Sequence, residues 1–122
     1  MMRILFAALA FFAAAAAPAY AERAVLRGLD KVTGHARDFS ATLGRPVRFG
    51  TLEVVARSCS KRAPEETPEV SVYVEVFDHP PVAEGAAAER VEIFHGWIFA
   101  SSPGLSAIEH PNYDIWAIDC RE

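Results

Sequence analysis

The feature that most constrains the fold is a strict alternation of valine with other residues. From Val70 to Phe77 the chain reads Val-Ser-Val-Tyr-Val-Glu-Val-Phe, so the valines fall on one side of an extended backbone. Successive side chains point to opposite faces of a β-strand, and this period of two therefore predicts a strand with one buried face. β-Branched residues also suit a pleated sheet better than a helix. The segment predicts a fold built from β-strands.

Weaker alternation predicts six more strands, at residues 24–29, 34–42, 46–49, 52–58, 90–100 and 113–120. Gly44 and Gly50 lie between three of them, as turn residues do. The two longest connections are charged or rich in Pro, Glu and Ala, which predicts exposed loops.

The pattern also predicts which side chains face inward. In the strand at 52–58, Leu52, Val54 and Ala56 share a side. In the last strand we expect Trp116 and Ile118 beside Cys120. One face of residues 90–100 carries Val91, Ile93, His95, Trp97 and Phe99.

One segment departs from the alternation. Ser102 is a good N-cap for a helix that begins at Pro103, and Pro111 would end that helix. Ser106 with Glu109 has the spacing of a capping box and is an alternative start. We expect one or two helical turns, packed over the end of the sheet by Leu105 and Ile108.

The chain has two cysteines, Cys59 and Cys120. If the domain is exported, which the first 21 residues indicate, the two cysteines predict one internal disulfide. It would hold the last strand beside or across from the strand at 52–58. A pair of free thiols and a bond between two chains are the alternatives. The spacing is unlike Cys-x-x-Cys, which disfavours a redox-active or zinc-binding pair.

The first 21 residues have the three parts of a signal peptide. Arg3 precedes an apolar run from Ile4 to Ala17, and Ala19-Tyr20-Ala21 forms a cleavage site. The alternative, a membrane anchor, requires roughly twenty apolar residues, and this run stops at Pro18. We therefore expect a cleavable signal peptide at 1–21, a single β-rich domain at 22–122 and no integral membrane span after cleavage.

Composition and pattern together define the fold class. We predict a mostly β protein, either a small antiparallel β-sandwich or a partly open barrel, with one short helix and one disulfide. Twelve Lys and Arg against sixteen Asp and Glu give a formal net charge of −4. This acidic balance disfavours a nucleic-acid partner, because the phosphate backbone is itself negative.

Three stretches resemble a known family. They are His95–Leu105 with His110–Cys120, then Leu26–Gly34, and Val47–Leu52. The resemblance covers nearly all of the chain after the leader and is to exported alphaproteobacterial proteins known only as domain of unknown function 2155. It implies a periplasmic protein, free or peripheral to the inner membrane. The resemblance also implies that the gene lies beside genes for accessory subunits of respiratory complex I. This implies an accessory role on the periplasmic face of that complex.

The residue types of a hydrolytic triad are present but weakly indicated. Ser101 or Ser102 would need His95 or His110 together with Asp114 or Asp119, and no Gly-x-Ser-x-Gly motif is present. The four histidines are His35, His79, His95 and His110, and none is three or four residues from another. This spacing disfavours a metal site. We expect no catalytic residue, metal or cofactor, and we expect His95 to be a partly buried, hydrogen-bonded side chain.

The best candidate for a site is an interaction surface along the segment that follows residue 100. Aromatic residues gather near it, either as core or as a recognition patch. The candidate surface comprises Trp97, Ser101, Ser102, Pro103, Gly104, His110, Asn112 and Tyr113.

Six arginines bias the first half of the domain basic: Arg23, Arg27, Arg37, Arg45, Arg48 and Arg57. They form either an ordinary mixed surface or a docking face for an acidic partner or anionic headgroups.

Three functions follow as hypotheses. The first is a non-enzymatic accessory domain that docks a protein partner in the envelope. The second is a small-ligand-binding or hydrolytic protein with a pocket beneath the segment from Ser101 to Tyr113. The third is a structural envelope component without a defined partner.

Overall fold

A computed structural model describes Ala10, residues 21–105 and residues 108–122. The predicted signal peptide lies almost entirely outside the described residues. The described part contains seven strands: β1 (Arg23–Asp30), β2 (Ala36–Thr42), β3 (Pro46–Phe49), β4 (Leu52–Lys61), β5 (Val70–Asp78), β6 (Val91–Phe99) and β7 (Tyr113–Arg121). All seven strands were predicted from the alternation, and the mostly β fold class is confirmed. No helix in the described part of the chain is long and apolar enough to span a membrane.

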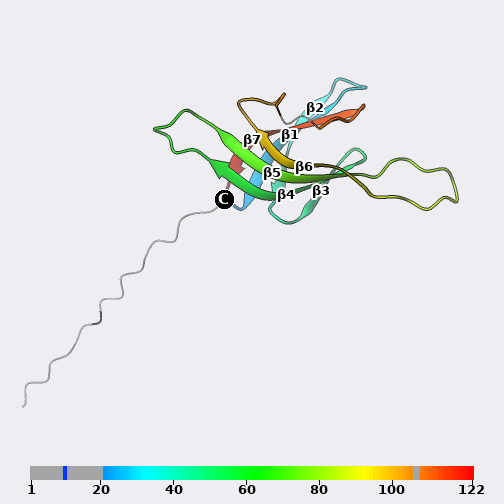
Figure 1. Cartoon of the computed structure of the whole chain (residues 1–122), viewed down its shortest axis with the longest axis horizontal. Helices are drawn as coiled ribbons and strands as arrows, with labels where there is room; N and C mark the ends of the chain where they lie inside the picture. Colours follow the sequence, from blue (N-terminus) through cyan, green and yellow to red (C-terminus); the bar gives the residue numbers. More distant parts are fainter. Residues whose placement is uncertain (1–9, 11–20, 106–107) are drawn as a thin grey trace, which may run out of the picture.

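The strands form two antiparallel sheets that face each other (Figure 1). One sheet has the order β2-β1-β7, and the other has the order β3-β4-β5-β6. The arrangement is the open sandwich, and the sheets do not close into a barrel. The β4–β5 and β5–β6 loops project from opposite ends of the long sheet (Figure 1).

The core lies between the two sheets and is built from the alternating faces. Val70, Val72, Val74 and Val76 are buried, as the alternation predicted. Leu52, Val54 and Ala56 of β4 are fully buried beside them. The short sheet contributes residues such as Leu26, Ile115 and Ala117.

The prediction for the faces of β6 was wrong. Ile98 is buried, whereas His95 and Trp97 are exposed on the outer face. The register shifts where Val76 pairs with Phe94 and Phe77 pairs with Glu92, which leaves Ile93 as an extra residue. Such a β-bulge reverses the inward and outward positions along a strand.

A second bulge makes the prediction for β7 wrong. The register shifts between Val25 and Leu26, so Ile118 has no partner on β1. Ile115 and Ala117 therefore face the core, and after the bulge Cys120 takes the same side. Trp116 pairs with Arg27 away from the core.

The predicted short helix is absent from the described residues after β6. Ser102 to Leu105 form a turn in which the Ser102 carbonyl accepts a hydrogen bond from the Leu105 amide at 3.1 Å. Residues 106 and 107, which include the alternative start at Ser106, lie outside the described residues. Pro103 followed by Gly104 favours a tight turn, and glycine disfavours a helix by about 1 kcal/mol. Leu105 is 80% exposed, so the predicted packing holds only for Ile108, which is 1% exposed.

The disulfide between Cys59 and Cys120 is present and joins the two sheets. The two Cα atoms are 5.8 Å apart. The bond connects β4 across the core to β7, and so it holds the last strand across from β4, which was one of the two predicted arrangements. Cys59 does not end its strand, because β4 continues to Lys61, which pairs with Val70.

Candidate functional site

The two ends of the sandwich are held together by different means. At one end, called here the disulfide end, Cys59 and Cys120 link the sheets. At the other end, β1 and β5 finish and β7 begins. This apical end carries a cluster of polar and aromatic side chains from separate strands and loops. The apical cluster comprises Lys31, Thr51, Asp78, His110 and Tyr113.

Asp78 and His110 form the centre of the apical cluster. The His110 ring nitrogen Nε2 lies 3.0 Å from Asp78 Oδ2, and the other ring nitrogen, Nδ1, accepts a hydrogen bond from the Asn112 amide at 3.0 Å. Because Nδ1 accepts, the ring proton of the neutral histidine lies on Nε2 and is donated to Asp78. The second carboxylate oxygen, Asp78 Oδ1, accepts the Thr51 hydroxyl at 2.7 Å. Both nitrogens and both oxygens therefore have protein partners.

Burial and hydrogen bonding act in opposite directions on Asp78. Burial by itself would raise the pKa of this carboxyl, but the hydrogen bonds from Thr51 and His110 outweigh it and lower the pKa. The His110 side chain is 8% exposed and that of Asp78 is 16% exposed. Asp78 is therefore held as a carboxylate in a mostly buried position.

Tyr113 forms the aromatic wall of this end. Its ring lies against His110, with ring centroids 5.2 Å apart, and meets the edge of Phe49 at 5.8 Å. The ring covers Gly50, where a Cβ atom would overlap it. Gly50 also has a φ of +56°, which side chains disfavour. Glycine is thus required here both by the backbone and by the ring.

Lys31 fastens the β1–β2 loop to the cluster. Its ammonium donates to the His110 carbonyl at 2.8 Å, and its amide donates to the Asn112 carbonyl at 2.8 Å. The loop itself is ordered by Asp30, whose Oδ1 accepts the amides of Val32 and Thr33. Two chain segments far apart in sequence are therefore locked together.

An open pocket adjoins the apical cluster. It has a volume of about 310 Å³. Phe49 and Tyr113 form its aromatic part, and the Gly50 backbone adjoins them. The polar side chains that line it are Asp30, Thr33, His35 and Arg37. We call it the apical pocket.

The serines, histidines and aspartates considered for a triad do not assemble. Ser101 donates to Glu69, and His95 hydrogen-bonds to Glu92 at 3.0 Å. His110 has an aspartate partner, but this partner is Asp78 and neither of the predicted candidates Asp114 and Asp119. The other ring nitrogen of His110, Nδ1, already accepts a hydrogen bond from the Asn112 amide, so it is not placed to take a proton from a nucleophile.

The other histidines lie in separate places. His79 contacts Glu53 at 3.3 Å, and Glu53 is also bound by Arg90. The hydrogen bond from Arg90 is the main cause that lowers the pKa of Glu53, with His79 contributing less. His35 lines the apical pocket. The described residues hold no group of three or more His, Cys, Asp or Glu side chains suited to a metal ion.

The candidate interaction surface is divided by the fold. His110, Asn112 and Tyr113 lie at the apical end. Ser101 lies near the other end, where its neighbour Ala100 donates to the Val70 carbonyl at 3.0 Å, and Ser102, Pro103 and Gly104 continue from it into the turn. Trp97 is 42% exposed on the outer face of β6 and meets Tyr73 edge-on at 5.5 Å.

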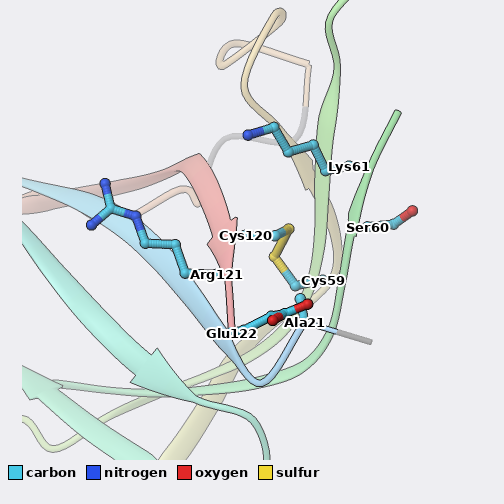
Figure 2. A pocket seen from close by; sticks show the side chains of 7 residues that line it. All are labelled: Ala21, Cys59, Ser60, Lys61, Cys120, Arg121 and Glu122. Carbon is cyan, nitrogen blue, oxygen red and sulfur yellow. A yellow bond between two sulfur atoms is a disulfide. The ribbon is translucent and has the colours of Figure 1, made fainter. Parts of the chain in front are cut away.

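The disulfide end is closed by covalent and ionic contacts. Figure 2 shows the sulfur–sulfur bond among the residues that line a depression at this end, which include Lys61 and Arg121. The depression has a volume of about 280 Å³. Lys61 pairs with Asp119 at 2.9 Å, and this hydrogen bond is the main cause that lowers the pKa of Asp119.

Sequence reasoning missed Lys31, Thr51 and Asp78 as members of the apical cluster. Asp78 had a weak signal, because it ends the most regular strand and precedes a loop. Nothing in the local sequence pairs it with His110, which is 32 residues away.

Comparison with known proteins places the chain among proteins of unknown activity. The chain is 25% identical over 92 residues to the "Uncharacterized protein RP359" of Rickettsia prowazekii (strain Madrid E). The match covers 75% of this chain and 56% of that relative, so the chain spans about half the length of the relative. No solved structure matches the chain. A family model described as "Uncharacterized protein conserved in bacteria (DUF2155)" matches residues 24–120, and the chain belongs to this family.

Proposed function

We propose that this chain is a non-enzymatic docking domain of a protein assembly in the bacterial envelope. The observation that carries the proposal is the way the apical cluster uses its chemical groups. Both ring nitrogens of His110 and both oxygens of Asp78 are bound by the protein itself. These groups therefore fix the structure of the apical end, while the apical pocket beside them stays open to a partner. A rigid surface with an open pocket suits recognition, because preorganisation reduces the entropy lost on binding.

Export to the periplasm is part of the proposal. The leader at 1–21 supports it, and so does the disulfide, since such bonds persist in oxidising compartments. The resemblance that implies an accessory role makes the periplasmic face of respiratory complex I the first partner to examine.

The alternative of a ligand pocket beneath the segment from Ser101 to Tyr113 has less support. Ile108 of that segment is 1% exposed and belongs to the core. Its side chain occupies the space on which this alternative depends.

Export is tested by the mass of the chain purified from its native cells. We expect a protein that begins near Glu22 and has its two cysteines oxidised. A chain that keeps Met1, or one with two free thiols, would contradict the export proposal.

Docking is tested by following a tagged chain through gentle solubilisation of the envelope. A tag after Glu122 lies at the disulfide end, because Arg23 donates to the Glu122 carbonyl there, and it leaves the apical end free. We expect the chain to migrate with a larger assembly in native electrophoresis. The same tag on a matched variant with Trp97→Ser tests whether the outer face of β6 takes part instead. Migration of the wild-type chain only as a free monomer would contradict docking.

A further inference from the structure

We infer that the apical pocket binds a carboxylate of an acidic peptide segment of the protein partner, and that Arg37 makes the contact. The inference rests on the proposed docking function and names the chemistry of its partner. It arises from one arginine that lies over two aromatic rings and has no carboxylate partner within the described residues.

Arg37 is exposed and has no carboxylate partner within the described residues. By contrast, Arg27 pairs with Asp38, Arg57 pairs with Glu75, and Arg90 pairs with Glu53. The Arg37 guanidinium instead lies over two aromatic rings, 5.6 Å from the centre of Phe39 and 5.1 Å from that of Phe49. Such stacking holds the planar group in place without using its N–H donors, which stay free for a carboxylate.

The rings that carry Arg37 are themselves fixed. Phe49 lies on Gly28, where an added Cβ atom would meet the ring at 2.5 Å. Phe39 and Phe49 are stacked, with ring centres 5.5 Å apart. Tyr113 closes the other side of the pocket against Gly50. The guanidinium is thus presented by a rigid platform, which lowers the entropic cost of binding.

The remaining polar groups favour a peptide over a simple anion. Thr33, His35 and Tyr113 line the pocket and can donate hydrogen bonds. Asp30 also lines it, and Oδ1 of its carboxylate already accepts two backbone amides of the loop. Its negative charge repels phosphate, which carries more than one negative charge at neutral pH, more strongly than it repels a single carboxylate. Its other oxygen can accept an N–H donor. An acidic residue in a peptide offers both a carboxylate for Arg37 and a backbone amide for Asp30.

Because the whole chain is negatively charged, binding of an acidic partner depends on the local contact with Arg37. With a formal net charge of −4, the protein as a whole does not attract an acidic partner over long distances. Affinity for a carboxylate must therefore come from short-range hydrogen bonds at Arg37.

The inference is tested by titrating the purified, oxidised protein with two blocked dipeptides while backbone amide signals are followed by NMR. The probe is acetylated and amidated phenylalanyl-glutamate, and its control is phenylalanyl-glutamine, which has nearly the same shape without the charge. We expect saturable millimolar binding of the first, with shifts at Thr33 and Gly50, and about tenfold weaker binding of the second. Inorganic phosphate is expected to bind no better than the glutamine control.

Variants assign the contact to Arg37. Arg37→Gln should weaken binding of phenylalanyl-glutamate about tenfold or more, and Arg37→Lys should lie between, because lysine keeps the charge without the fork of donors. Arg48→Gln removes an exposed arginine of the neighbouring β3 strand and should leave binding unchanged. Thermal unfolding of each variant checks that the fold is retained.

Several outcomes would overturn the inference. They are equal binding of the two dipeptides, no saturable shift, binding of phosphate in preference to phenylalanyl-glutamate, or an equal loss in Arg48→Gln. In the native envelope, Arg37→Glu should abolish migration with the assembly. If that variant migrates as the wild type does, the Arg37 contact is wrong and docking stands. If the wild type itself migrates alone, docking fails, and the dipeptide titration still decides the chemistry of the pocket.

Discussion

The disulfide end and the apical end solve the same problem by different chemistry. Each must hold the short sheet to the long sheet at the point where the strands finish. At the disulfide end one covalent bond joins β4 to β7. At the apical end Asp78 of β5 hydrogen-bonds to His110, which leads into β7, and Phe49 of β3 meets the ring of Tyr113, where β7 begins.

The difference separates stability from recognition. A disulfide stabilises chiefly by restricting the unfolded chain, so it needs little from its surroundings. The apical cluster depends on the position of each group and on the ionised state of Asp78, and it fixes the walls of an open pocket. We therefore expect substitutions at the two ends to differ in size, in pH dependence and in their effect on binding.

The largest effect is expected from breaking the disulfide. The two cysteines are 61 residues apart, and closing a loop of that length restricts the unfolded chain by about 4 kcal/mol. Cys59→Ser and Cys120→Ser should each lower the free energy of unfolding by a similar amount, measured by denaturant titration. A large effect from only one of the two would show that its local packing matters more than the bond.

The next largest effect is expected at Gly50. Alanine there must adopt a positive φ and also overlaps the Tyr113 ring, so Gly50→Ala should cost about 3 kcal/mol. Gly44→Ala is the matched control, because Gly44 has a φ of +81° and no atom near its Cβ position. It should cost only about 1 kcal/mol. Equal losses in thermal unfolding would mean that the Tyr113 contact contributes nothing.

A smaller loss is expected from removing His110. His110→Ala leaves Asp78 in a mostly buried position without its imidazole partner, which should cost about 2 kcal/mol. His95→Ala is the control, since His95 also pairs with a carboxylate but is 67% exposed, and it should change stability by less than about 0.5 kcal/mol. Denaturant unfolding compares the two. Similar losses would mean that the His110–Asp78 pair contributes no more to stability than the exposed His95–Glu92 pair.

The smallest expected effect is a difference between Asp78→Asn and the wild type in how stability depends on pH in acid. Hydrogen bonds from Thr51 and His110 overcome the effect of burial and lower the pKa of Asp78 in the folded protein. The unfolded chain then binds more protons at acidic pH, so the stabilisation is complete above the ordinary aspartate pKa near 3.9 and is lost as pH falls through the folded pKa. Asp78→Asn should therefore unfold with a shallower dependence on pH below about 4 than the wild type.

The comparison with Cys59→Ser completes the acid experiment. This variant is less stable at every pH, but its dependence on acid should match that of the wild type, because no titrating group is lost. If Asp78→Asn and the wild type lose stability in parallel, the apical cluster does not account for the acid sensitivity.

Local patterns were enough to predict the strands and the disulfide. Alternation such as that from Val70 to Val76 is set by the geometry of a single strand, so it is visible before any partner is known. The disulfide could be predicted because the chain has two cysteines and the loop between them is long enough to close. The short helix predicted after Ser102 is absent from the described residues, because the turn preference of Pro103 and Gly104 prevails there over the helix cap and the later proline.

Tertiary structure decided what the sequence could not. The sides on which Trp97 and Cys120 lie depend on bulges opposite Val76 and Val25, and a bulge is a property of two paired strands. The meeting of Asp78 with His110 depends on how two sheets stack, since the residues belong to segments far apart in the chain. The chain by itself thus determined its strands and its cross-link through local geometry and residue chemistry. Only packing between the sheets, which is nonlocal, brought the apical cluster and the Arg37 pocket into being.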